Sequence, residues 1–158
     1  NRELQKGAIG EVIRTAVYAC TPLAKRLQVE IDNRVGEGLA PVRLDPKRLP
    51  QVFLNLLENA IQHSKSGGTV TVEGEMVCHG DQSWITCAVR DCGPGFQDGD
   101  LTRIFEPFFT RRRGGTGLGL SIVQKIVEEH EGTIVAQNAP EGGAVMVVKF
   151  PAAAVNQE

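Results

Sequence analysis

The sequence has little that would place the protein in a membrane, outside the cell or around a structural zinc ion. No apolar run reaches the roughly 20 residues that a membrane-spanning helix requires, and no leader with basic, apolar and small-residue parts is present. The four cysteines (Cys20, Cys78, Cys87 and Cys92) are not closely paired, as zinc ligands would be. We therefore expect a soluble cytoplasmic domain whose cysteines are small, buried apolar residues.

The chain also lacks a strong net charge and has few aromatic residues. Its formal net charge is −2, and aromatic residues make up 5% and apolar residues 41% of its 158 residues. This composition indicates a globular chain and provides no basic surface for nucleic acid. A chain of this length fits one domain, so we expect one folded unit. From its weak charge and its lack of long apolar runs, we expect no nucleic-acid partner and no membrane contact of its own.

Apolar residues recur at helical spacing in three segments. The first runs from Gly7 to about Gln28, the second from an N-cap at Asp45 with Pro46 in its first turn, and the third from about Gly117. Alternating segments predict strands at VEIDN, PVRLD, TVTVEGEMV, SWITCAVRD, TIVAQN and AVMVVKF. This order predicts an α+β fold, a two-layer α/β sandwich in which three helices cover one face of a mixed, mostly antiparallel sheet.

We place the domain boundaries near the two ends of the chain. Residues 7–151 form the predicted domain, residues 1–6 the end of a linker or of a preceding helical hairpin, and residues 152–158 a C-terminal tail.

A polar stripe runs beside the apolar face of the second helix. At about 100° per residue, Gln51, Asn55, Asn59 and Gln62 fall on this stripe. An amide oxygen suits Mg²⁺, which takes further ligands from water and substrate phosphates. Ordinary solvated helix residues would give the same pattern, so the stripe alone leaves both interpretations open.

The segment DCGPGF directly follows the strand that ends at Arg90. The carboxylate of Asp91 accepts hydrogen bonds only, and therefore suits an exocyclic amine. Gly93 and Gly95 allow the backbone to turn or to pass close to a flat ligand. A plain turn is the alternative interpretation.

Two further segments, RIFEPFFTRRR and GGTGLGLSIV, lie between this loop and the third helix. Phenylalanines in an irregular stretch indicate a mobile lid rather than plain disorder. The three arginines after Thr110 offer forked donors to phosphate, or else face solvent or a partner. The glycine-rich segment opens into a helix, whose N-terminal N–H groups favour phosphate, although it matches neither the P-loop nor the dinucleotide fingerprint.

In this order, the four segments resemble the ATP-binding catalytic domain of bacterial sensor histidine kinases, a branch of the GHKL superfamily with the Bergerat fold. The resemblance extends from about Gly7 to Pro151. QVFLNLLENAIQHS is similar to the family's N box, DCGPGF and GTGLGL to its two glycine boxes, and IFEPFF to its F box.

The resemblance implies a site for ATP and Mg²⁺. It makes Asn59 the Mg²⁺ ligand, assisted by Asn55, and makes Asp91 the acceptor for the adenine amino group. The other residues that it assigns to ATP are Gln62, His63, Gly93, Gly95, Phe105, Phe108, Arg111, Arg112, Gly115, Thr116, Gly117, Leu118, Gly119 and Leu120. Residues 97–114 correspond to the ATP lid.

The chain departs from the family pattern at three positions. Many relatives have lysine at the position of Gln62, tyrosine at that of His63 and threonine at that of Ala144. These departures remove a lysine on the phosphate side and a hydroxyl group near the adenine.

The resemblance implies that the domain holds Mg·ATP while a histidine on a separate dimerisation and phosphoacceptor domain of the same parent protein attacks the γ-phosphate, for onward transfer to a response regulator. In related ATPases and serine kinases, a glutamate base stands where this chain has Asn55, and an amide cannot take that proton. The alternatives are a GHKL ATPase or serine kinase, and a nucleotide-dependent interaction module without catalysis. His63, His79 and His130 lack the phosphoacceptor context, and membrane anchorage of the parent protein stays open.

Overall fold

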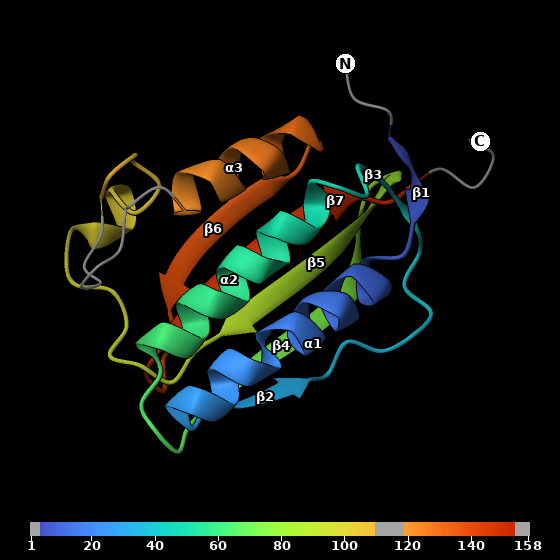
Figure 1. Ribbon diagram of the computed structural model, residues 1–158. Coiled ribbons are helices and arrows are strands. Elements are labelled where there is room, and N and C mark those ends of the chain that lie inside the picture. Colours follow the sequence, from blue (N-terminus) through green and yellow to red (C-terminus); the bar gives the residue numbers. More distant parts are fainter. Residues whose placement is uncertain (1–3, 110–118, 154–158) are drawn as a thin grey trace.

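The computed structural model describes residues 4–109 and 119–153, which form two layers. Helices α1 (Ile9–Leu27), α2 (Leu49–His63) and α3 (Gly119–Glu129) lie on the same face of a sheet (Figure 1). α2 lies between the other two helices and contacts both of them. The predicted α+β sandwich with three helices on one face is confirmed.

The main sheet has the strand order β2-β4-β5-β7-β6. Its strands are β2 (Glu30–Asn33), β4 (Thr69–His79), β5 (Gln82–Arg90), β7 (Ala144–Pro151) and β6 (Thr133–Asn138). β2 pairs with β4 in parallel, and the other neighbours are antiparallel. The sheet is therefore mixed and mostly antiparallel, as predicted, and β5 ends beside the start of β7.

Helix α2 forms the centre of the hydrophobic core. Its buried residues are Leu49, Val52, Phe53, Leu56, Leu57, Ala60 and Ile61, which are the apolar positions of the helical period. They belong to one core cluster with buried residues of β4, β5 and β7, among them Val72, Ile85 and Val148. Because this apolar face fixes the rotation of α2, the polar stripe must lie at the edge of the core.

The start of α2 differs from the prediction. The helix begins at Leu49 rather than just after Asp45. Asp45 Oδ1 accepts hydrogen bonds from the N–H groups of Lys47 (2.9 Å) and Arg48 (3.3 Å). Asp45 therefore caps a separate turn that precedes the helix, because its side chain competes locally for backbone donors.

Ordered contacts extend beyond both predicted domain boundaries. Strand β1 (Gln5–Gly7) pairs antiparallel with β3 (Val42–Leu44) in a small second sheet. Ala152 forms a bridge with Val42, and the N–H of Ala153 donates to the Pro41 carbonyl at 2.7 Å. A three-residue strand is too short to show alternation, so the sequence pattern did not predict β1.

His130 directly follows α3 and is buried. Its Nδ1 lies 2.8 Å from the Ile126 carbonyl, and its Nε2 accepts the N–H of Asp45 at 3.0 Å. The ring also meets Phe150 edge-on. His130 therefore ties the end of α3 to the turn before α2.

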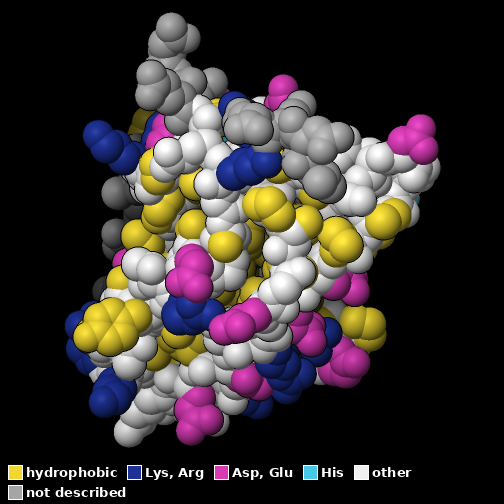
Figure 2. Space-filling model, turned by 90° about the vertical axis from the view of Figure 1, so that its right-hand side faces the viewer, with side chains coloured by type: hydrophobic (Ala, Val, Ile, Leu, Met, Phe, Trp, Pro, Cys, Tyr) yellow, Lys and Arg dark blue, Asp and Glu magenta, His cyan; other side chains and the backbone are white. Residues whose placement is uncertain are grey.

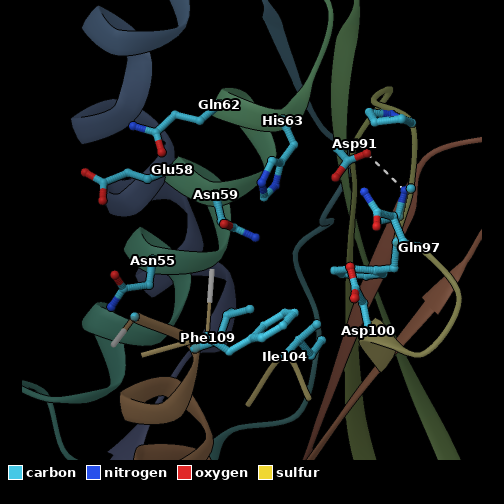
Figure 3. A pocket seen from close by; sticks show the side chains of 16 residues that line it. Asn55, Glu58, Asn59, Gln62, His63, Asp91, Gln97, Asp100, Ile104 and Phe109 are labelled. Atoms are coloured by element: carbon cyan, nitrogen blue, oxygen red, sulfur yellow. Dashed lines mark hydrogen bonds between the residues drawn. The ribbon is translucent and has the colours of Figure 1, made fainter. Parts of the chain in front are cut away.

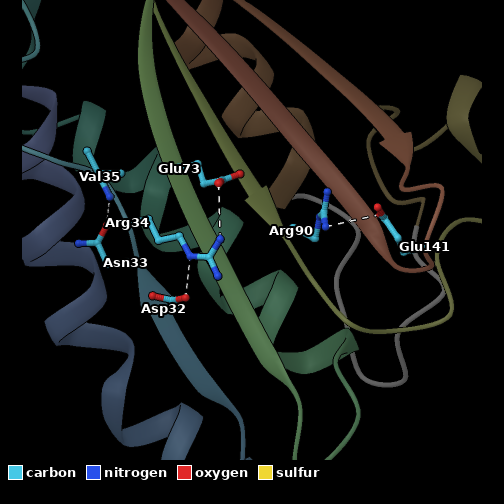
Figure 4. A network of polar contacts seen from close by, with 7 residues as sticks. All are labelled: Asp32, Asn33, Arg34, Val35, Glu73, Arg90 and Glu141. Carbon is cyan, nitrogen blue, oxygen red and sulfur yellow. Dashed lines mark hydrogen bonds and ion pairs between the residues drawn. The ribbon is translucent and has the colours of Figure 1, made fainter.

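The helix-free face of the sheet carries exposed ion pairs (Figure 4). Arg34 contacts Asp32 at 2.8 Å and Glu73 at 3.7 Å, and Arg90 contacts Glu141 at 3.6 Å. Such exposed pairs contribute little to stability. On the face shown in Figure 2, acidic and basic side chains are interspersed, so no patch of one sign covers it. Within the described ranges, no helix is both long and apolar enough to cross a membrane.

The cysteines differ in exposure, and the prediction that all four are buried is wrong for Cys78. Cys20 and Cys87 are buried, Cys92 is intermediate and Cys78 is exposed. Burial raises the pKa of Cys20 to about 11 and that of Cys87 to about 12. We expect a thiol reagent at pH 8 to modify Cys78 first, and Cys20 and Cys87 only after unfolding. Mass spectrometry of labelled peptides checks this order, and early labelling of Cys87 would contradict it.

Candidate functional site

A cavity of about 320 Å³ lies beside α2 (Figure 3). One wall is the polar stripe of α2, the opposite wall is the loop after β5, and the start of α3 closes one end. The described lining residues are Asn55, Glu58, Asn59, Gln62, His63, Asp91, Pro94, Gly95, Phe96, Gln97, Asp100, Ile104, Phe109, Gly119, Leu120 and Ala144. Two of the four sequence segments thus meet in one cavity with the described parts of the other two.

Asp91 is held rigidly at the end of β5. Only 6% of its surface is exposed. Its Oδ1 accepts hydrogen bonds from the N–H groups of Gly93 and Ala144, both at 2.9 Å, while its own N–H donates to the Ala144 carbonyl at 2.9 Å. The other carboxylate oxygen points across the cavity toward α2 (Figure 3). One oxygen is therefore structural, and the other is available to a ligand.

Close packing of the backbone at Gly143 supports this arrangement. Gly143 has a φ of +85°, and a Cβ built on it would lie 2.2 Å from the carbonyl oxygen of Asp91. A side chain would both clash and be strained. The turn before β7 thus lies in close contact with the backbone of Asp91. Ala144, which follows Gly143, lines the cavity.

The four α2 residues predicted to bind ATP, Asn55, Asn59, Gln62 and His63, all line the cavity, and the first three of them belong to the polar stripe. Asn59 and His63 point toward the wall with Asp91, whereas Gln62 points away from it (Figure 3). Asn55 Nδ2 donates to the Gln51 carbonyl at 2.9 Å. This bond leaves Asn55 Oδ1 facing α3, where it would lie 3.6 Å from a Cβ built on Gly119.

The F-box residues that meet the cavity differ from those predicted. Ile104 and Phe109 line it, whereas Phe105 and Phe108 do not. Phe105 packs against the core. Phe108 is 72% exposed and has a φ of +69°. The irregular backbone of this segment does not follow a helical or strand period, so the sequence could not show which rings face inward.

The remaining predicted residues are placed only in part. Gly95, Gly119 and Leu120 line the cavity. Gly93 does not line it, but its N–H donates to Asp91 Oδ1. Arg111, Arg112, Gly115, Thr116, Gly117 and Leu118 lie outside the described residues.

Several residues of the cavity were not found by sequence reasoning. Asp100 is buried and lines it, as do Glu58 and Gln97. Glu58 lies on the rim and points away from Asp91 (Figure 3). Asn138 holds the loop after β5 from the end of β6. Such contacts join distant segments, and no local pattern signals them.

The donor set of α2 fits Mg²⁺. In residues 4–109 and 119–153, no three His, Cys, Asp or Glu side chains gather as a metal site. The amide side chains of Asn59 and Asn55 supply oxygens on the α2 wall of the cavity. Mg²⁺ commonly takes few protein ligands and completes its shell with water and substrate phosphates, so this sparse set suits a metal that arrives with a nucleotide.

Comparisons with known proteins agree with this geometry. Residues 44–154 match the family described as "Histidine kinase-, DNA gyrase B-, and HSP90-like ATPase". Sensor histidine kinase ZraS of Salmonella typhi is 34% identical over 155 residues, which cover 98% of this chain and 33% of ZraS. Sporulation kinase E of Bacillus subtilis is 31% identical over 143 residues, which cover 90% of this chain and 19% of the kinase. The chain thus spans a third or less of these relatives.

Solved structures show the same fold. Full-length ShkA in complex with AMPPNP has a TM-score of 0.83 and 28% identity, over 98% of this chain and 32% of ShkA. The catalytic domain of histidine kinase ThkA has a TM-score of 0.82 and 28% identity, over 95% of this chain and 96% of that domain. The chain therefore belongs to the family of histidine kinase-, DNA gyrase B- and HSP90-like ATPases, as an ATP-binding catalytic domain of the sensor histidine kinase type.

Proposed function

We propose that this domain holds Mg·ATP in the cavity beside α2 and transfers the γ-phosphate to a histidine on a separate dimerisation and phosphoacceptor domain of the same parent protein. An imidazole nitrogen forms a bond to the γ-phosphorus while the bond to the bridging oxygen breaks, and ADP leaves. The phosphoryl group then passes to the receiver domain of a response regulator. Positioning and charge neutralisation supply most of the catalysis in such transfers.

One observation carries the proposal: a rigid acceptor and a pair of amide oxygens face one cavity. Asp91 presents a free carboxylate oxygen on one wall, where it suits the adenine amino group. Asn59 lies on the opposite wall, and Asn55 Oδ1 faces the start of α3. Backbone N–H groups at a helix N-terminus favour phosphate. The cavity thus matches a nucleotide that spans from Asp91 to α3, with Mg²⁺ on Asn59.

Asn55 supports transfer to a histidine over hydrolysis of ATP. Its side-chain nitrogen is engaged with the Gln51 carbonyl, and an amide is not a base. Water and serine need a base before they attack, whereas imidazole is a ready nucleophile. Glu58 points away from the cavity centre (Figure 3), so it is poorly placed to substitute.

The test is label transfer from γ-labelled ATP. We expect the chain to label the phosphoacceptor domain of its parent protein when the two are mixed, and to release inorganic phosphate only at background rate alone. Steady phosphate release that depends on Glu58 would instead favour the ATPase. Nucleotide binding without any transfer would favour an interaction module.

Phe108 is a candidate anchor for the phosphoacceptor domain. It is a large apolar side chain, 72% exposed, on backbone with a φ of +69°. Strained backbone that presents an apolar ring is often functional. We expect Phe108→Ala to lower the rate of histidine phosphorylation about tenfold, the effect of losing one interface anchor, with little change in the dissociation constant for ATP.

The matched control is Val135→Ala on β6, because Val135 is also exposed (53%) and apolar. It is expected to change neither quantity. Phe105→Ala is less informative, because Phe105 packs against the core. An equal loss of phosphorylation and ATP binding in Phe108→Ala would refute the docking role.

A further inference from the structure

Gln97 is a polar side chain on the same wall of the cavity as Asp91. It lines the cavity, and its amide points into the space between that wall and α2 (Figure 3). In the part of the chain that the structure describes, this amide has no hydrogen bond, whereas the Gln97 carbonyl accepts the N–H of Asp100 at 3.0 Å. The backbone of Gln97 is thus fixed, and its side chain is available to a ligand.

Asn138 fixes the residue before Gln97. Its Oδ1 accepts the N–H of Phe96 at 2.7 Å, and its Nδ2 donates to the Phe96 carbonyl at 3.2 Å. The Asn138 side chain thus bonds both backbone groups of Phe96, as the backbone of a neighbouring β-strand would. Gly95, with a φ of +82°, makes room for it, because a Cβ there would lie 2.7 Å from Asn138 Oδ1.

The chemistry of Asp91 leaves recognition of a base incomplete. A carboxylate only accepts hydrogen bonds, so it pairs with the exocyclic amine of adenine but leaves the ring nitrogens of the base without a donor. An amide offers both a donor and an acceptor. Gln97 is the described residue beside Asp91 that carries such a group into the cavity.

We propose that Gln97 recognises the purine base together with Asp91, and that Asn138 is a positioning residue that acts through the backbone of Phe96. The inference rests on the proposed ATP site and extends it by naming a second base-contacting residue. It assigns the wall formed by Asp91, Phe96 and Gln97 to the base, and leaves the phosphates to α2 and α3.

The first test is Gln97→Ala in the 158-residue chain, titrated by calorimetry with ATP, adenosine and tripolyphosphate. Losing one neutral hydrogen bond should raise the dissociation constants of ATP and adenosine about 3- to 10-fold. Tripolyphosphate has no base, so its binding should not change. Gln137→Ala is the matched control, because Gln137 is an exposed glutamine on β6 that does not line the cavity.

The second test is Asn138→Ala, alone and combined with Gln97→Ala. If Asn138 acts through Gln97, the two substitutions should not be additive. The double variant should then bind ATP about as tightly as whichever single variant has the lower affinity. Hydrogen exchange should show faster exchange of the Phe96 N–H in Asn138→Ala, with the melting temperature nearly unchanged. Asn138→Asp retains an acceptor for that N–H and should restore part of the protection.

Equal ATP affinity in Gln97→Ala and the unaltered chain would overturn the inference and leave the proposed function intact. Additive losses in the double variant would overturn the positioning role of Asn138. A failure of the unaltered chain to bind ATP at all would instead count against the proposed function. If Asn138→Ala does not fold, Gln97→Ala still decides the main claim, because Gln97 is exposed.

Discussion

Asp91→Asn is expected to weaken ATP binding about 100-fold, as loss of a charge-assisted hydrogen bond and gain of a donor in its place would do. Asp91 Oδ1 accepts two backbone N–H groups, so the amide that replaces the carboxylate must keep its oxygen there. Its nitrogen then faces the cavity, where it meets the adenine amine donor to donor. Calorimetry measures the change directly.

The matched control for this variant is Asp98→Asn. Asp98 is an exposed carboxylate in the same loop that does not line the cavity, so we expect unchanged affinity. Because Asp91→Asn keeps the size of the side chain and the acceptor for both N–H groups, its melting temperature should stay close to that of the unaltered chain. Unchanged ATP affinity in Asp91→Asn would show that the base lies elsewhere.

Asn59→Ala is expected to remove the dependence of ATP binding on Mg²⁺ and to lower histidine phosphorylation about 100-fold. A bound metal ion contributes several kcal/mol to stabilising the charge that develops at a transferring phosphoryl group, and about 1.4 kcal/mol corresponds to tenfold in rate. Binding of ATP without Mg²⁺ should be little affected. Titrations with and without Mg²⁺, and the rate of label transfer, check the two effects.

Gln51→Ala is the matched control for Asn59→Ala. Gln51 lies on the same polar stripe of α2 but does not line the cavity, and the substitution keeps the backbone carbonyl that Asn55 uses. It should leave the Mg²⁺ dependence intact. Persistence of that dependence in Asn59→Ala would assign the metal to other ligands.

The parts of the fold that follow a period were predictable from the sequence. The apolar face of α2 fixed its rotation, and its rotation placed the amides of Asn55 and Asn59 at the cavity. The strands β4 to β7 showed alternation and were located correctly. In each case the apolar period of a helix or strand repeats over many residues, so the prediction does not depend on any single position.

Features that depend on single contacts between distant segments were not predictable. The hydrogen bonds between Asn138 and Phe96 join residues 42 positions apart, and no sequence pattern near either residue predicts them. Likewise, Ile104 and Phe109 line the cavity in place of Phe105 and Phe108, because packing of an irregular segment depends on the fold around it. The start of α2 was predicted too early because of a local contact. The Asp45 side chain caps a separate turn rather than the helix itself.

Titration of ATP into the unaltered chain, with and without Mg²⁺, tests the central claim that the cavity beside α2 is a site for Mg·ATP. We predict binding at one site, tighter with Mg²⁺ than without, and about 100-fold weaker in Asp91→Asn. No heat of binding in either condition, from a chain shown to be folded, would contradict the claim and favour an interaction module that does not use the nucleotide.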